Sequence, residues 1–142
     1  MTRLRIGVFG AGMVAQVEHV PNLLHLREKF DLVAVADPSA KARSFIESRF
    51  GVATEPTLDA LLSRKLDALL IAAPDFCHVS AVEKALQAGL HVMAEKPLCY
   101  DPADADRLAH AQNASGRFVQ VAHMKRFDPS YLAALSLVDG MG

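Results

Sequence analysis

Short apolar runs alternate with segments in which apolar residues recur at helical spacing. The runs lie at residues 4–9, 32–36, 52–54, 66–73, 90–94 and 118–122. The helical segments lie at residues 13–26, 39–50, 57–64, 79–88, 102–114 and 129–138. Strands that are apolar throughout and are separated by single helices are typical of a parallel sheet covered on both faces. The pattern therefore predicts an α/β fold, in which a doubly wound parallel sheet of six strands (a Rossmann fold) forms a single domain over residues 1–142.

Single residues refine this prediction. Pro21 is expected to break or restart the first helix near its middle, because proline has no N–H to donate. Asp101 is expected to cap the helix at 102–114. Phe45 is expected to face inward from the helix at 39–50, and His91, inside a strand, to be a hydrogen-bonded core histidine.

Composition narrows the class of protein. The hydrophobic fraction of 51% is too high for a disordered chain, and no run reaches the roughly 18 apolar residues of a membrane span. Fifteen Lys and Arg residues against sixteen Asp and Glu residues give a net charge of −1, without the clustered positive charge typical of nucleic-acid binding. The start of the chain lacks a secretory signal pattern, and Cys77 and Cys99 are too few for a disulfide framework. We expect a cytoplasmic chain with no nucleic-acid and no membrane partner.

The first strand is followed by a glycine turn with the pattern G-x-G-x-x-A, from Gly10 to Ala15. Gly10 permits a tight turn, Gly12 lets the backbone approach a pyrophosphate, and Ala15 keeps the following helix close to the sheet. The helix N-terminus then offers free N–H groups to the anion. A glycine turn that merely closes a βα unit is the alternative. The predicted cofactor contacts in this turn are Gly10, Ala11, Gly12, Met13 and Val14, although the Met13 side chain is most simply a packing residue.

An acidic residue, Asp37, ends the second strand 22 residues after Ala15, close to the separation of roughly 20 expected for a ribose-binding carboxylate. Such a carboxylate accepts hydrogen bonds from the adenosine ribose and repels a 2′-phosphate, so NAD is the expected cofactor, with NADP as the open alternative. Lys41 and Arg43 soften this preference only if they turn toward the ribose, and we interpret them as solvated helix charges.

The turns after the fourth and fifth strands are expected at the same carboxyl edge of the sheet. They contain Ala73, Pro74 and His78 in the first turn and Glu95, Lys96 and Pro97 in the second. A lysine directly after a buried strand is held on rigid backbone, where it is placed to give or take a proton. Spacing alone leaves a solvated loop lysine equally open.

These segments together resemble the Gfo/Idh/MocA oxidoreductases, the family of glucose–fructose oxidoreductase and inositol dehydrogenase. The resemblance rests on the glycine turn, Asp37, the Ala-Pro-x-x-x-His turn ending at His78, the tripeptide Glu95-Lys96-Pro97, and the segment at 125–129. It implies an NAD(P)-dependent enzyme that transfers a hydride at an alcohol carbon of a sugar, inositol or related polyol.

Residue roles follow from the resemblance at matching positions. Lys96 takes the role of the catalytic lysine that assists proton transfer, and Glu95 that of the residue that contacts the nicotinamide ribose. Pro97 shapes the turn, the segment from Pro74 to His78 flanks the cofactor, and Arg126 matches an arginine near the cofactor or substrate. The segment His123-Met124-Lys125 departs from the commoner Phe-Asn-Arg, which weakens the match at Arg126.

In this family a second, C-terminal domain holds most of the substrate, and nothing in residues 1–142 resembles it. A truncation, an excised domain and a stand-alone subunit all remain open. We expect the chain to bind NAD(H) without turnover on its own. Without a covering domain, Leu132, Leu135 and Val138 are expected to be exposed and to promote homo-oligomer formation.

Alternative chemistries receive less support. The six histidines and two cysteines show no metal-ligand spacing, so no metal site is expected. A non-catalytic dinucleotide sensor is the main competing function, and the presence of Lys96 favours the enzyme. Elimination with transient oxidation of the cofactor is a third possibility.

Overall fold

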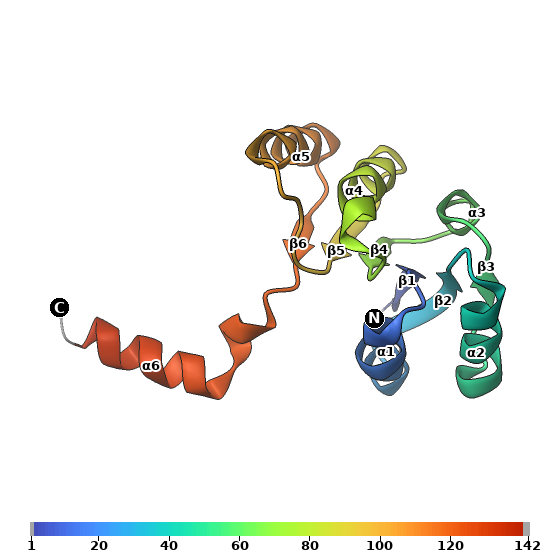
Figure 1. Cartoon of the computed structure of the whole chain (residues 1–142), viewed down its shortest axis with the longest axis horizontal. Coiled ribbons are helices and arrows are strands. Elements are labelled where there is room, and N and C mark those ends of the chain that lie inside the picture. Colours follow the sequence, from blue (N-terminus) through green and yellow to red (C-terminus); the bar gives the residue numbers. More distant parts are fainter. Residues whose placement is uncertain (1, 141–142) are drawn as a thin grey trace.

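The computed structural model describes residues 2–140, and its six strands form one parallel sheet in the order β3-β2-β1-β4-β5-β6 (Figure 1). The strands are β1 (Leu4–Phe9), β2 (Phe30–Ala36), β3 (Thr54–Glu55), β4 (Ala68–Ile71), β5 (His91–Ala94) and β6 (Val119–Val121). The helices are α1 (Val20–His25), α2 (Ala40–Phe50), α3 (Leu58–Leu62), α4 (His78–Gln87), α5 (Pro102–Ser115) and α6 (Pro129–Asp139). The predicted fold class and its six strands are confirmed.

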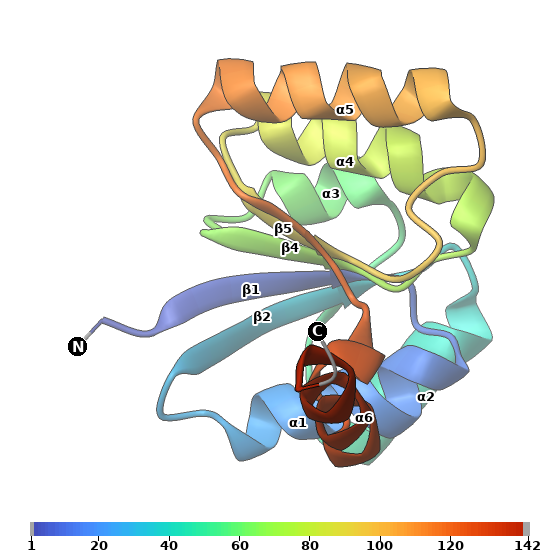
Figure 2. The same ribbon diagram turned by 90° about the vertical axis from the view of Figure 1, so that its left-hand side faces the viewer.

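Helices cover both faces of the sheet, with α3, α4 and α5 on one side and α1 and α2 on the other (Figure 2). Each side has its own apolar core. Leu61, Ile71 and Val82 are buried in the first core, and Val20 and Ile46 in the second. The sheet is therefore shielded from water on both faces, which is why its strands are apolar throughout.

The first helix changes its hydrogen-bond spacing before Pro21. A π-helical turn spans Ala15–His19, in which the N–H of Val20 donates to the carbonyl oxygen of Ala15, and α1 begins directly after it. Because Pro21 has no N–H, the regular four-residue ladder cannot continue through it. The predicted interruption is thus present, as a widened turn within one continuous helical segment.

Other local predictions have mixed outcomes. Asp101 caps α5 as predicted, since its side chain accepts a hydrogen bond from the N–H of Ala103. The inward orientation of Phe45 is wrong: Ile46 is buried on α2, and its neighbour Phe45 is 43% exposed. The core position predicted for His91 is also wrong, because β5 begins at this residue and its side chain is exposed. Its ring is hydrogen-bonded as predicted, since it accepts the N–H of Phe118.

The last helix, α6, extends away from the sheet and its covering helices (Figure 1). Leu132, Leu135 and Val138 are 50%, 58% and 65% exposed, which confirms the expected apolar surface. Among residues 2–140, no helix has the length and apolar character needed to cross a bilayer.

Candidate functional site

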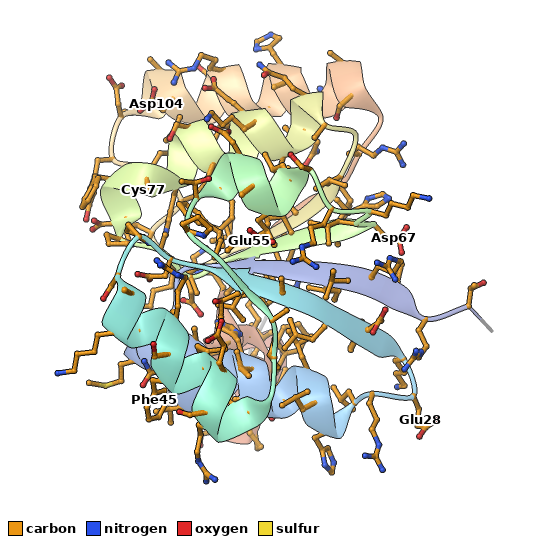
Figure 3. All side chains as sticks on the ribbon, turned by 90° about the vertical axis from the view of Figure 1, so that its right-hand side faces the viewer. Glu28, Phe45, Glu55, Asp67, Cys77 and Asp104 are labelled. Atoms are coloured by element: carbon orange, nitrogen blue, oxygen red, sulfur yellow. The ribbon has the colours of Figure 1, made fainter. Side chains whose placement is uncertain are left out.

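The carboxyl ends of β1, β2, β4 and β5 form one continuous edge. Figure 3 shows Cys77, which follows β4, at this edge and Asp67, which precedes β4, at the opposite edge. Backbone hydrogen bonds tie the strand ends together: Gly10 N–H to Ala36 O at 2.8 Å, Ala72 N–H to Phe9 O at 2.7 Å, and Glu95 N–H to Ile71 O at 2.9 Å. The turns that carry the predicted site residues therefore start from a rigid edge.

The glycine turn after β1 places its two glycines in different surroundings. Gly10 has a φ of +104°, and a Cβ added there would lie 2.5 Å from the backbone of Ala72, so the turn requires glycine at this position. A Cβ added at Gly12 would meet nothing within 4 Å. The space in front of Gly12 is therefore free to receive a group that approaches the backbone closely.

The helix that follows this turn has an uncapped N-terminus. No side chain caps it, and Gln16 N–H donates to Gly12 O at 3.0 Å, so the N–H groups before Gln16 precede the regular ladder. Ala15 is fully buried, as expected for close packing on the sheet. The expected packing role of the Met13 side chain is wrong, because this side chain is 79% exposed. The next residue, Val14, is 43% exposed. Free N–H groups at a helix N-terminus beside open space are suited to a phosphate.

Asp37 lies beside this turn and is half-buried. Its Oδ2 accepts a hydrogen bond from Ala11 N–H at 2.8 Å, and its Oδ1 accepts one from Ser39 N–H at 2.8 Å. Each carboxylate oxygen has a second lone pair that remains available to a ligand hydroxyl. Asp37 therefore orients the glycine turn and places a negative charge beside it.

Arg43 has a different role from the one the sequence suggests. Its Nη1 donates to the carbonyl oxygens of Asp37 at 2.7 Å and Pro38 at 3.0 Å. The interpretation of Arg43 as a solvated helix charge is wrong, because it holds the loop between β2 and α2. Lys41 is exposed, as predicted.

His78 joins the turns that follow β4 and β5. Its ring is 1% exposed, with Nδ1 at 2.7 Å from Pro97 O and Nε2 at 2.9 Å from Ala73 O. The peptide bond between Lys96 and Pro97 is cis. His78 thus connects two other predicted site residues, Ala73 and Pro97, and it is a buried histidine of the kind that was expected at His91.

A second side-chain contact links the same two turns at the surface, where the Tyr100 hydroxyl donates to the Asp75 carboxylate. This hydrogen bond, together with one from Phe76 N–H, holds the pKa of Asp75 below its usual value, and the same hydrogen bond raises the pKa of Tyr100. Burial raises the pKa of the nearby Cys77 thiol, so this cysteine is not activated as a thiolate.

Lys96 is exposed at the end of β5, and its neighbour Glu95 is held by two contacts. His19 Nε2 lies 2.9 Å from Glu95 Oε1, with the two side chains 13% and 14% exposed. Glu95 Oε2 accepts the N–H of Lys96 at 3.2 Å. Sequence reasoning missed the role of His19, which it weighed only as a metal ligand. The local signal available for it is Pro21, which predicts an irregular helix beside His19.

Arg126 lies apart from these contacts, on an exposed 3₁₀ turn at Met124–Phe127 after β6. Its approach to a cofactor or substrate stays a prediction. Within the described residues no three potential metal-ligating side chains gather at one place. The donors and acceptors at the carboxyl edge are the N–H groups after Gly12 and the carboxylates of Asp37 and Glu95, with Lys96 directly after Glu95.

This set of groups fits a dinucleotide. A dinucleotide binds across the point where the strand order reverses, which here lies between β1 and β4. The open space at Gly12 and the uncapped helix suit its pyrophosphate, and Asp37 suits the ribose on the β2 side.

Comparison with known proteins agrees with this geometry. Residues 4–123 match the model of an oxidoreductase family with an NAD-binding Rossmann fold, Gfo/Idh/MocA. Inositol 2-dehydrogenase 3 of Saccharopolyspora erythraea is 35% identical over 141 residues, which cover 98% of this chain and 41% of that protein. An inositol 2-dehydrogenase of Corynebacterium glutamicum (strain R) is 32% identical over 139 residues, covering 96% and 41%. The chain thus spans about two fifths of the length of these relatives.

Solved structures resemble the chain over the same extent. One is scyllo-inositol dehydrogenase from Lactobacillus casei with bound NAD(H) and scyllo-inositol, with a TM-score of 0.88 and 27% identity over 98% of this chain and 42% of that one. Another is KijD10, a 3-ketoreductase from Actinomadura kijaniata in complex with NADP and TDP-benzene, with a TM-score of 0.89 and 28% identity over 98% and 43%.

Proposed function

The chain belongs to the Gfo/Idh/MocA oxidoreductase family with its NAD-binding Rossmann fold, and we propose that it forms the dinucleotide-binding part of an enzyme acting on an alcohol carbon of an inositol, sugar or related polyol. One observation carries the proposal: the carboxyl edge places an uncapped helix N-terminus, the Asp37 carboxylate and the Glu95-Lys96 pair along the path of a dinucleotide.

In this proposal the chain's groups divide along the cofactor. The N–H groups after Gly12 bind the pyrophosphate, and the second lone pairs of Asp37 accept hydrogen bonds from the adenosine ribose. Glu95 accepts hydrogen bonds from the nicotinamide ribose. Because Asp37 carries a negative charge at the position of a 2′-phosphate, we propose NAD as the preferred cofactor.

Lys96 is the proposed catalytic residue. The cofactor, when bound, gives or accepts the hydride. The Lys96 amine, exposed at the end of a rigid strand, then holds the substrate hydroxyl and moves its proton as the carbinol carbon becomes a carbonyl. The rigid edge contributes by keeping Lys96 at a fixed distance from the reacting carbon. Arg126 is proposed as an additional cofactor or substrate contact.

The proposed substrate class follows from the relatives, two of which are named inositol 2-dehydrogenases. We assign residues 1–142 to one cofactor-binding domain, with the main substrate contacts outside it. The apolar side chains of α6 (Leu132, Leu135 and Val138) are then available to a further part of the protein or to a second copy of it.

Fluorescence titration of NADH tests the binding half of this proposal. We expect saturable binding by these 142 residues, and no NADH formation when NAD is supplied with inositols or sugars. In the protein that carries this chain, Lys96→Met should retain NADH binding and lose dehydrogenation. Absence of NADH binding would refute the proposed function, and turnover by the 142 residues alone would refute the assignment of substrate contacts outside them. If the whole protein oxidised no polyol, the alternative of a non-catalytic dinucleotide sensor would be favoured instead.

A further inference from the structure

We propose that His19 is a positioning residue that holds the Glu95 carboxylate in the orientation needed to bind the nicotinamide half of the dinucleotide. The proposal rests on the proposed function and deepens it. It is carried by the 2.9 Å contact between His19 Nε2 and Glu95 Oε1 and by the low exposure of both side chains, 13% and 14%.

The two contacts of Glu95 leave it with a defined orientation. His19 Nε2 is hydrogen-bonded to Oε1, and the backbone N–H of Lys96 donates to Oε2, so the protein itself fixes both oxygens. One lone pair on each oxygen remains for a ligand hydroxyl. A glutamate without such contacts samples several rotamers, and a ligand that binds it must supply the ordering free energy.

The chain places His19 by an unusual local structure. His19 is the last residue of the π-helical turn Ala15–His19, directly before α1. A π-helical turn holds one more residue than an α-helical turn, which rotates the residues at its end relative to a regular helix. Pro21 prevents the regular ladder at this point, and the resulting turn aims His19 across the end of β1 toward the end of β5.

The position of Glu95 assigns this contact to the nicotinamide half. In a doubly wound sheet each half of the strand order binds one mononucleotide. Asp37 follows β2 on one side of the reversal point, and Glu95 follows β5 on the other. His19 therefore orients Glu95, which contacts the nicotinamide ribose of NADH in this proposal. ADP lacks that ribose and does not contact Glu95.

This difference gives a direct test on the 142-residue chain, with NADH and ADP titrated separately. His19→Leu removes the hydrogen bond, and His19→Gln places an amide N–H near the original Nε2 position. His25→Leu is the matched control, because His25 is an exposed histidine at the end of the same helical segment. The loss of one hydrogen bond to a charged group leads us to expect roughly tenfold weaker NADH binding by His19→Leu.

We expect His19→Leu to leave ADP affinity unchanged, His19→Gln to recover most of the NADH affinity, and His25→Leu to match the parent chain for both ligands. Equal losses for NADH and ADP in His19→Leu would overturn the proposal, because they would show that His19 supports the helix or the fold as a whole. Unchanged NADH affinity in His19→Leu, or equal losses in the Leu and Gln variants, would also overturn it. A parent chain that binds neither ligand would instead refute the proposed function itself.

Discussion

Replacing Asp37 with asparagine tests the proposal that this carboxylate favours NAD over NADP. The substitution removes one negative charge at the end of β2 and keeps the size of the side chain. It also changes the glycine turn after β1, because Asp37 accepts hydrogen bonds from the N–H groups of both Ala11 and Ser39 and an asparagine has only one carbonyl oxygen for the two donors. The change in the turn weakens the binding of NADH and of NADPH alike. The ratio of the two affinities therefore isolates the charge.

The size of the ratio follows from Coulomb's law. A carboxylate about 4 Å from one phosphate charge is repelled by about 1 kcal/mol in water and about 4 kcal/mol at the effective dielectric of a protein surface. Asp37 is half-buried, so an intermediate value of about 2 kcal/mol is appropriate, which is a factor of about 30 in affinity. Arg43 stays on the carbonyl oxygens of the loop and does not replace the lost selectivity. We expect Asp37→Asn to shift the NADH-to-NADPH affinity ratio toward NADPH by about 30-fold.

The assay is a pair of fluorescence titrations, one with NADH and one with NADPH, on the parent chain and two variants. Asp31→Asn is the matched control: it removes the same charge from the same strand, near the amino end, where Asp31 pairs with Arg5 at 3.0 Å. Six residues along a strand place it roughly 20 Å from Asp37, beyond the screening length of about 10 Å. An unchanged ratio in Asp37→Asn, or the same shift in both variants, would refute the assignment of cofactor selectivity to Asp37.

Three further substitutions test the geometry of the site. Gly10→Ala should lower the free energy of unfolding in urea by at least about 1–2 kcal/mol, because φ is +104° and the added Cβ would clash with the backbone. Gly12→Ala should leave the free energy of unfolding unchanged and weaken NADH binding. If its NADH affinity equalled that of the parent chain, the proposed phosphate site at Gly12 would be refuted. Tyr100→Phe should return the pKa of Asp75 toward its ordinary value of 3.8, as measured by carboxyl NMR titration. Since that pKa is lowered in the fold, its stabilising contribution is present above pH 3.8 and is lost as the pH falls through the lowered value. The pKa of Tyr100 is raised, so its contribution is present below pH 10 and is lost as the pH rises through the raised value. If the melting temperatures of Tyr100→Phe and the parent chain responded identically to pH, the stabilising contact between Tyr100 and Asp75 would be contradicted.

The fold could be predicted from the sequence because its main signal is local. A strand buried on both faces must be apolar along its whole length, as at Ile6–Val8 and Leu69–Ile71, and each such run is followed by its own helix. The predicted site residues that follow β1, β2, β4 and β5 also lie at one edge, since parallel strands place all their carboxyl ends there.

The contacts that link those residues could not be predicted in the same way. His19 reaches Glu95 across 76 positions, and His78 reaches Pro97 across 19, so both contacts depend on the strand order and on the twist of the sheet. Arg43 is a further case: its spacing on α2 is that of a surface residue, and only the path of the preceding loop brings two carbonyl oxygens within its reach.

These missed contacts share one physical role, which bears on how the site binds. Asp37 joins the loop after β2 to the glycine turn, His19 joins the first helical segment to Glu95, and His78 joins the turns after β4 and β5. Each turn that is proposed to contact the dinucleotide is therefore attached by a side chain to a second element. A turn that is already ordered loses little conformational entropy on binding, so more of its interaction free energy appears as affinity. Asp37 and His78, recognised from the motifs, and His19, which the motifs missed, thus hold in place the turns that are proposed to contact the dinucleotide.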